Sequence, residues 1–223
     1  DSAYINNDFA SAVYLYENIL AKQGESADIY YNLGNSYYKM DNIAKAIVNY
    51  EKALVLNPAN GDIRFNLELA QSRTVDKVIP MSEVFLVTWM KNLTNLMSEK
   101  GWAKLGIISF ILMLLMLALY FFGKKISMKK VGFISAICLL FICILANFFA
   151  SSQKDKAQSH GSAIIMTPSI TVKSTPNEGG TDLFILHEGR KVNIKDNTMR
   201  EWKEIQLEDG NAGWVPASAI EII

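Results

Sequence analysis

The sequence predicts a multidomain chain in which an all-α repeat superhelix, an α-helical transmembrane hairpin and a small all-β barrel follow one another. Three observations lead to this order. The first part of the chain has helical periodicity inside a 34-residue window, the middle has two long uncharged apolar segments, and about 60 residues at the end form short alternating runs.

Residues 27–60 carry the pattern of two short antiparallel helices. The residues that mark it are Tyr30, Leu33, Gly34, Tyr37, Ala46, Tyr50, Ala53 and Pro58. Gly34 and Ala46 are small where the two helices cross closely, and aromatic rings fill the gaps beside them. Pro58 ends the second helix. The window resembles a tetratricopeptide repeat at every marker position, and this resemblance implies a superhelix of helix pairs in residues 1–79.

Partial repeats flank the full one. Stepping back 34 residues puts Ala12, Tyr16 and Ile19 in the same register, and stepping forward puts Arg64, Leu67 and Glu68 in it. Repeat arrays need about three units to bury their faces. One whole unit and two partial ones therefore leave an open end, which residues ahead of Asp1 or a partner would cover.

The tetratricopeptide resemblance implies a ligand groove lined by the first helices of the repeats. Carried over position by position, the lining is Asp28, Tyr31, Asn35, Tyr38, Lys39, Phe65, Leu69 and Arg73. Some family members clamp a terminal carboxylate with cations, but those positions here hold Asp62 and Asn66. The mixed aromatic and polar lining favours a peptide or helix of another protein. For any single residue, a packing or solvated role stays open.

Residues 80–101 form an amphipathic segment after a break at Pro80. Apolar residues at 84, 85, 89, 93 and 96 recur at helical spacing, with polar residues between them. Just ahead of a membrane span, this pattern suits an interfacial helix anchored by Trp89 and Trp102. An extra helix packed on the repeats is the alternative.

Two apolar segments, residues 102–123 and 131–150, are predicted to be transmembrane helices. The uncharged run from Leu105 to Gly123 alone has 19 residues, and about 20 residues span the roughly 30 Å of hydrocarbon in a bilayer. The turn at residues 124–130 holds Lys124, Lys125, Lys129 and Lys130 and no acidic residue. The segments therefore form a hairpin with a cationic tip.

The lysine turn also predicts orientation. Cationic loops stay on the cytoplasmic side, so both termini are expected in the periplasm of a bacterial cell, with the chain crossing the inner membrane twice. Because the chain starts at Asp1 and an exported N-terminus needs a signal sequence, we expect that such a sequence was removed.

Composition excludes some classes of function. The net charge is zero, but residues 1–79 hold seven basic against ten acidic side chains and residues 163–223 hold six against nine. Neither part is a basic patch, so a nucleic-acid partner is not expected. Cys138 and Cys143 match no metal or disulfide motif. No nucleophile with a base, metal cluster or phosphate loop is recognisable, so we expect neither an enzyme nor a cofactor.

A polar linker, residues 151–162, precedes a predicted β-domain at residues 163–223. Seven short β-like runs are separated by Pro, Gly, Asn and Asp, as in a small antiparallel barrel. The HEG turn before a strand, Trp202 at the start of another and the Gly213 to Pro216 run resemble a bacterial SH3 domain. Trp202 and Trp214 are candidates for a peptide or glycan platform, although core and turn packing is the preferred role for both.

The whole order of elements is similar to that of proteins of the bacterial aerotolerance (Bat) operon family. Segments such as YYNLGNSYYKM, RFNLELAQSRTVDKV and DGNAGWVPASAIE carry this resemblance together. It implies tolerance of oxygen or envelope stress, with other Bat proteins, including von Willebrand factor A domain and repeat proteins, and a MoxR-type ATPase as partners. The leading hypothesis is a non-catalytic scaffold, and the alternative is an envelope sensor whose SH3-like domain binds cell-wall peptide or glycan.

Overall fold

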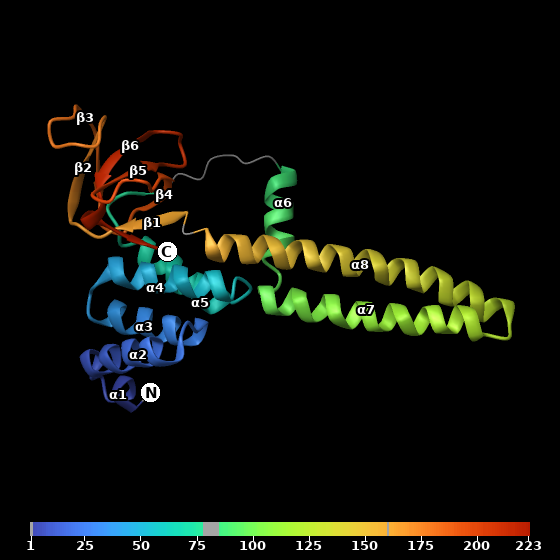
Figure 1. Ribbon diagram of the computed structural model, residues 1–223. Helices are drawn as coiled ribbons and strands as arrows, with labels where there is room; N and C mark the ends of the chain where they lie inside the picture. Colours follow the sequence, from blue (N-terminus) through green and yellow to red (C-terminus); the bar gives the residue numbers. More distant parts are fainter. Residues whose placement is uncertain (1, 78–84, 160) are drawn as a thin grey trace. The chain divides into compact units, whose positions relative to one another are not determined.

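The computed structural model describes residues 2–77, 85–159 and 161–223, which form two compact units (Figure 1). The first unit joins residues 1–85 to residues 159–223, and the second consists of residues 86–158. The expected break at Pro80, the first residues of the amphipathic segment and His160 of the linker lie outside the described residues.

Five helices lie within the described residues 2–77 of the first unit. They are α1 (Ser2–Ile5), α2 (Phe9–Gln23), α3 (Ala27–Lys39), α4 (Ile43–Leu56) and α5 (Gly61–Gln71). The side chains of Asp8, Asn42 and Asn60 accept hydrogen bonds from backbone N–H groups at the starts of α2, α4 and α5, because the first N–H groups of a helix have no partner within it. The helix pair predicted within residues 27–60 is α3 with α4.

The two helices of the full repeat cross where Gly34 meets the ring of Tyr50. A Cβ atom on Gly34 would lie 2.7 Å from two ring carbons of Tyr50, whose side chain is 1% exposed. Ala46 and Ala53 are fully buried in the same cluster, and Tyr37 donates a 2.6 Å hydrogen bond to Glu17 of α2. Small residues at the crossing and aromatic rings around it therefore produce the close packing that the sequence predicts.

The C-terminal part of the first unit is an antiparallel sheet with the order β3-β2-β6-β5-β4-β1-β7. Its strands are β1 (Ser162–Ile165), β2 (Ser169–Lys173), β3 (Asp182–His187), β4 (Lys191–Asp196), β5 (Trp202–Gln206), β6 (Ala212–Pro216) and β7 (Ile220–Ile222). Each of the seven predicted runs supplies one strand. Alternate residues such as Val172, Ile205 and Val215 are fully buried and form its core.

The sheet packs against α4 of the repeats. Ile164 of β1 is fully buried in the helical cluster, while Glu51 pairs with Lys191 at 2.6 Å and Lys52 pairs with Glu221 at 2.7 Å. The described part of the third repeat has only its first helix, α5. The sheet thus covers a face of α4, so the chain itself contributes to closing the array that was expected to need preceding residues or a partner.

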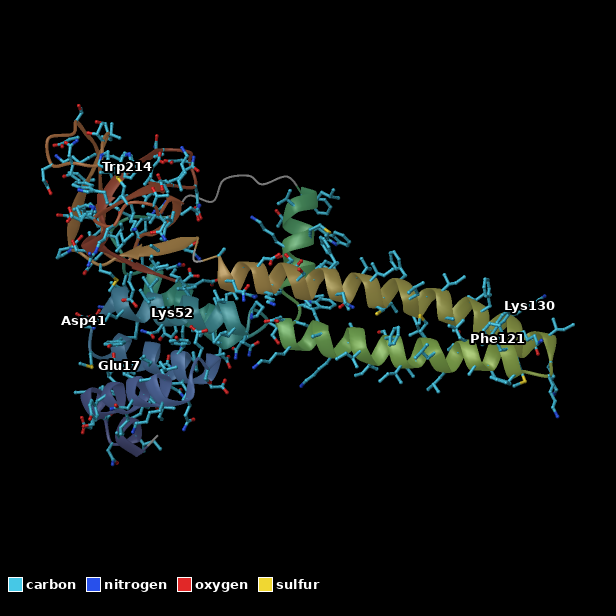
Figure 2. The ribbon with its side chains drawn as sticks, viewed as in Figure 1. Glu17, Asp41, Lys52, Phe121, Lys130 and Trp214 are labelled. Carbon is cyan, nitrogen blue, oxygen red and sulfur yellow. The ribbon has the colours of Figure 1, made fainter. Side chains whose placement is uncertain are left out.

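The second unit consists of α6 (Phe85–Thr94), α7 (Glu99–Phe122) and α8 (Ile126–Gln158). Along α7 and α8 many apolar side chains are exposed, among them Ile107, Leu115 and Phe141. Both helices are long and apolar enough to cross a membrane. The side chains of this unit are drawn in Figure 2, in which Phe121 and Lys130 mark the turn of the hairpin.

Helix α8 is longer than the predicted residues 131–150 at both ends. It begins at Ile126, inside the predicted turn, and continues to Gln158, so most of the predicted linker is helical. The sequence from 151 to 158 is polar but contains no glycine or proline, and Lys, Ala and Gln favour helices. A change to polar composition ends the apolar segment without ending the helix.

Candidate functional site

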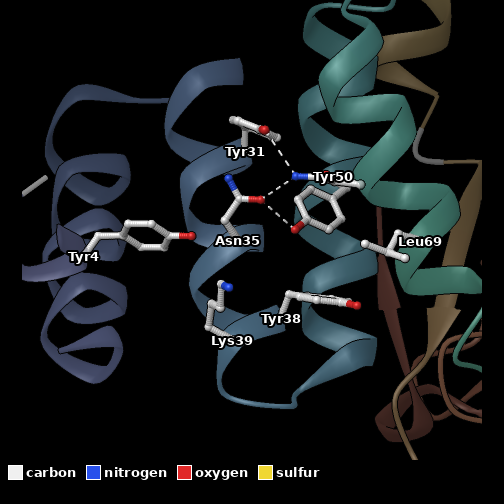
Figure 3. Close-up of a pocket in the computed structure, with 8 residues that line it drawn as sticks. Tyr4, Tyr31, Asn35, Tyr38, Lys39, Tyr50 and Leu69 are labelled. Atoms are coloured by element: carbon white, nitrogen blue, oxygen red, sulfur yellow. Dashed lines mark hydrogen bonds between the residues drawn. The ribbon is translucent and has the colours of Figure 1, made fainter. Parts of the chain in front are cut away.

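A cavity of about 300 Å³ opens on the side of the repeats that is formed by α1, α3 and α5, the first helices of successive repeats (Figure 3). Side chains from four helices line it, namely Tyr4, Tyr31, Asn35, Tyr38, Lys39, Tyr50, Asn66 and Leu69. Half of them come from α3, which forms the floor of the groove. Four phenols, two amides, one ammonium group and one aliphatic side chain thus surround a single concave surface.

A hydrogen-bond network holds the floor of this groove in one arrangement. The carboxamide oxygen of Asn35 accepts from the Tyr50 hydroxyl and from the Asn66 amide, both at 2.8 Å. The same Asn66 amide donates to the Tyr31 hydroxyl at 3.2 Å. With its oxygen occupied, the Asn35 side chain has N–H donors left to offer a ligand.

The groove is rich in hydrogen-bond donors. Burial, followed by the nearby phenols, raises the pKa of Tyr50, so its hydroxyl stays protonated at physiological pH. Within the described part of the chain, no carboxylate pairs with Lys39, whose ammonium group lies beside Asn35 in Figure 3. Such a surface complements a ligand that presents hydrogen-bond acceptors, such as the carbonyl and carboxylate oxygens of a peptide, better than a ligand that presents donors.

The structure brings together five of the eight residues predicted to line the groove, which are Tyr31, Asn35, Tyr38, Lys39 and Leu69. Arg73 lies at its edge, where its guanidinium stacks 5.4 Å from the Tyr38 ring centroid and pairs with Asp41 at 2.6 Å. Phe65 and Asp28 are exposed and do not line the cavity. Asp28 is in the first turn of α3, ahead of Tyr31, and Phe65 lies about 100° from Asn66 around α5.

Three lining residues were not predicted as groove residues. Tyr50 was assigned to packing, although the hydroxyl of its buried ring reaches the groove and bonds Asn35. Asn66 was considered only as a position where a clamp would need a cation. Tyr4 belongs to the short helix α1, where too little of the repeat is present to show its register.

The two tryptophans of the β-domain lie on one outer face of the sheet. Trp214 of β6 is opposite Glu204 of β5, and Trp202 lies two residues from Glu204, so all three side chains share a face. Neither tryptophan is part of the buried cluster around Val172 and Ile205. Both rings are partly buried, so core and turn packing, the role preferred from the sequence, stays a prediction for them.

His187 has a partner that its sequence neighbours did not reveal. Its ring Nδ1 lies 2.8 Å from one oxygen of Asp76, and its backbone N–H donates to the other at 2.7 Å. Asp76 is 111 residues away. Among the described residues there is no cluster of three or more His, Cys, Asp or Glu side chains that could hold a metal ion.

The helices that contribute most of the groove, α3 and α4, lie in a segment with a recognisable family signature. Residues 27–60 match the family model for the tetratricopeptide repeat. The chain contains a tetratricopeptide repeat. Repeats of this kind are typical of non-catalytic, protein-binding modules. No curated protein matches the chain.

Proposed function

We propose that this chain is a non-catalytic, membrane-anchored scaffold that holds a segment of a partner protein in its repeat groove. The observation that carries the proposal is the lining of the groove. Tyr31 and Tyr38 offer apolar ring surface, while Asn35 and Lys39 offer donors on the same concave face. A peptide strand or helix presents both apolar side chains and carbonyl oxygens, so it fits this combination.

The membrane anchor is the hairpin of α7 and α8. In the first unit, Glu51 and Lys52 contact Lys191 and Glu221, and the hairpin lies between these pairs in the sequence. Parts of a chain that touch each other outside the bilayer must be on the same side of it, which requires an even number of crossings. Two apolar helices meet this requirement. The four lysines of the turn favour the cytoplasm for the tip and the periplasm for both soluble parts.

We further propose that the partners are Bat proteins and that the chain is of the BatE type in that family. The support is the order of its parts: repeats, an amphipathic helix, an apolar hairpin and a terminal β-domain that we take to be SH3-like. A scaffold with both soluble parts beside the inner membrane would present partners such as von Willebrand factor A domain proteins to one another. A MoxR-type ATPase would act on the cytoplasmic side, and the output would be tolerance of oxygen or envelope stress.

Substitution of two partly buried tyrosines of the groove, Tyr31 and Tyr38, tests the scaffold. We expect Tyr31→Ala combined with Tyr38→Ala to lower recovery of Bat proteins from mild detergent about tenfold or more, because loss of an aromatic anchor at an interface costs about 2 kcal/mol. The measurement is quantitative mass spectrometry of affinity-purified complexes. Tyr14→Ala is the matched control, since Tyr14 is 67% exposed on α2 and does not line the groove. Equal recovery with the groove variant and the control would contradict the proposal.

A second candidate function rests on the outer face of the sheet that carries Trp202 and Trp214. Partly exposed aromatic rings on one surface suit the apolar faces of sugars. If the β-domain is an envelope sensor, the full chain will sediment with purified cell wall and Trp202→Ala will abolish this. Met199→Ala is the control, because Met199 is exposed nearby in the sequence. Sedimentation that is unchanged in the Trp202 variant would remove this candidate.

A further inference from the structure

The end of the hairpin opposite the lysine turn holds a junction of three helices. The carbonyl oxygen of Thr94, at the end of α6, accepts from the indole Nε1 of Trp102 on α7 and from the amide Nε2 of Gln153 on α8, both at 2.9 Å. The last carbonyls of a helix have no partner within it. Side chains from both long helices therefore cap α6.

Gln153 is the central residue of this junction. Its side chain is almost fully buried, at 3% exposure. Besides Thr94, its amide lies 3.3 Å from Asn95 Oδ1 and 3.4 Å from the Met97 carbonyl oxygen. One side chain of α8 thus binds both the last residue of α6 and the turn that leads from it into α7, which fixes the direction in which α6 leaves the hairpin.

Helix α6 runs across α7 and α8 rather than along them (Figure 1). Met90 and Leu93 of α6 pack against the cluster of Trp102, Ala146 and Phe149, whose two aromatic rings lie 4.9 Å apart. These contacts of α6 are therefore apolar as well as polar, and they lie at this end of the hairpin.

The apolar face of α6 is wider than the part that the hairpin covers. At about 100° per residue, Phe85, Leu86, Trp89, Met90 and Leu93 fall on one side of the helix. Met90 and Leu93 contact the hairpin, but Leu86 and Trp89 are 66% and 51% exposed. The opposite side carries Val87, Thr88 and Lys91, and Asn92 lies at the edge of the apolar face beside Phe85.

We infer that α6 lies in the plane of the membrane surface at the non-cytoplasmic end of the hairpin, with Leu86 and Trp89 in lipid, and that Gln153 holds it there. This rests on the proposed membrane span of α7 and α8. Since the hairpin axis follows the membrane normal, a helix that crosses it lies along the surface. The exposed apolar residues of α6 then continue the lipid-facing surface of α7, and Trp89 occupies the interfacial zone that tryptophan favours. Gln153 is a positioning residue that fixes how deep α6 lies in the membrane surface.

Spin labels test this arrangement in the full chain reconstituted in phospholipid vesicles. With Cys138 and Cys143 replaced by Ala, single cysteines at Leu86 and Lys91 report the two faces of α6, and one at Leu115 on α7 reports the span. We expect labels at 86 and 115 to collide with oxygen more than with a water-soluble nickel complex, and the label at 91 to do the reverse. Exposure of 86 to nickel with 115 still in lipid would overturn the inference about α6 alone. Accessibility of the label at 115 to nickel would contradict the proposed membrane span of α7 itself.

Gln153→Ala tests the positioning role. We expect the variant to raise the nickel accessibility of the label at 86 several-fold while the label at 115 is unchanged, because α6 is no longer capped by α8. Gln158→Ala is the control on the same helix, since Gln158 is exposed. Labels at 86 and 91 that are both shielded from nickel would instead show α6 packed against protein on both faces, and this outcome also overturns the inference.

Discussion

Replacement of Gly34 by valine is expected to lower the free energy of unfolding of the repeat region by about 3 kcal/mol, the upper part of the range for overpacked cores. The reason is the 2.7 Å that separates the site of a new Cβ from the Tyr50 ring. The ring cannot move aside, because it is 1% exposed and its hydroxyl is bonded to Asn35. The two helices of the repeat must separate instead.

Thermal unfolding followed by circular dichroism measures this effect. A loss of this size corresponds to a fall in melting temperature of about 6–12 °C for a domain of roughly 150 residues or more. Gly61→Val is the control, because a Cβ atom at Gly61 meets nothing within 4 Å. An unchanged melting temperature in the Gly34 variant would contradict the close crossing of α3 and α4.

A second variant separates the clash from other effects of valine. Tyr50→Leu removes the ring that the new side chain meets, at the cost of a smaller buried side chain. We expect the loss in the combined Gly34→Val and Tyr50→Leu variant to be smaller than the sum of the two single losses, since the residues are in direct contact. Additive losses would mean that the valine acts elsewhere.

The sequence predicts the elements of this fold better than the contacts between distant parts. Residues 27–60 give α3 and α4 because the spacing of Gly34, Ala46 and Tyr50 is a local pattern that a single repeat carries in full. The strands follow from alternating residues for the same reason. By contrast, the bond between Asp76 and His187 joins residues 111 positions apart, and no local pattern encodes such a pairing.

The candidate site likewise combines residues that a local pattern predicts with residues that are placed by the packing of separate helices. Tyr31, Asn35 and Tyr38 lie on one face of α3, so helical spacing alone groups them. Tyr4 reaches the groove from α1 and Asn66 from α5, and their positions depend on how separate helices stack. Gln153 follows the apolar part of α8 and reads as a solvated linker residue, whereas its amide is buried against the end of α6. Its role depends on α8 extending beyond the apolar segment.

Labelling of single cysteines is expected to give an all-or-none result for the membrane topology, because a cysteine on one side of a bilayer is inaccessible to a reagent confined to the other side. The proposed scaffold requires the repeats and the β-domain to share the periplasmic side. Gln23, Ser127 and Asn211 are exposed positions in the repeats, the lysine turn and the β-domain. With Cys138 and Cys143 replaced by Ala, a single cysteine at each position reports the side on which it lies.

Labelling of intact spheroplasts with a membrane-impermeant maleimide is the most direct measurement of the central claim. We predict that cysteines at Gln23 and Asn211 are modified and that the one at Ser127 reacts only after the membrane is permeabilised. Modification at Ser127 with protection at the other two positions would reverse the orientation, and the periplasmic scaffold would have to be abandoned.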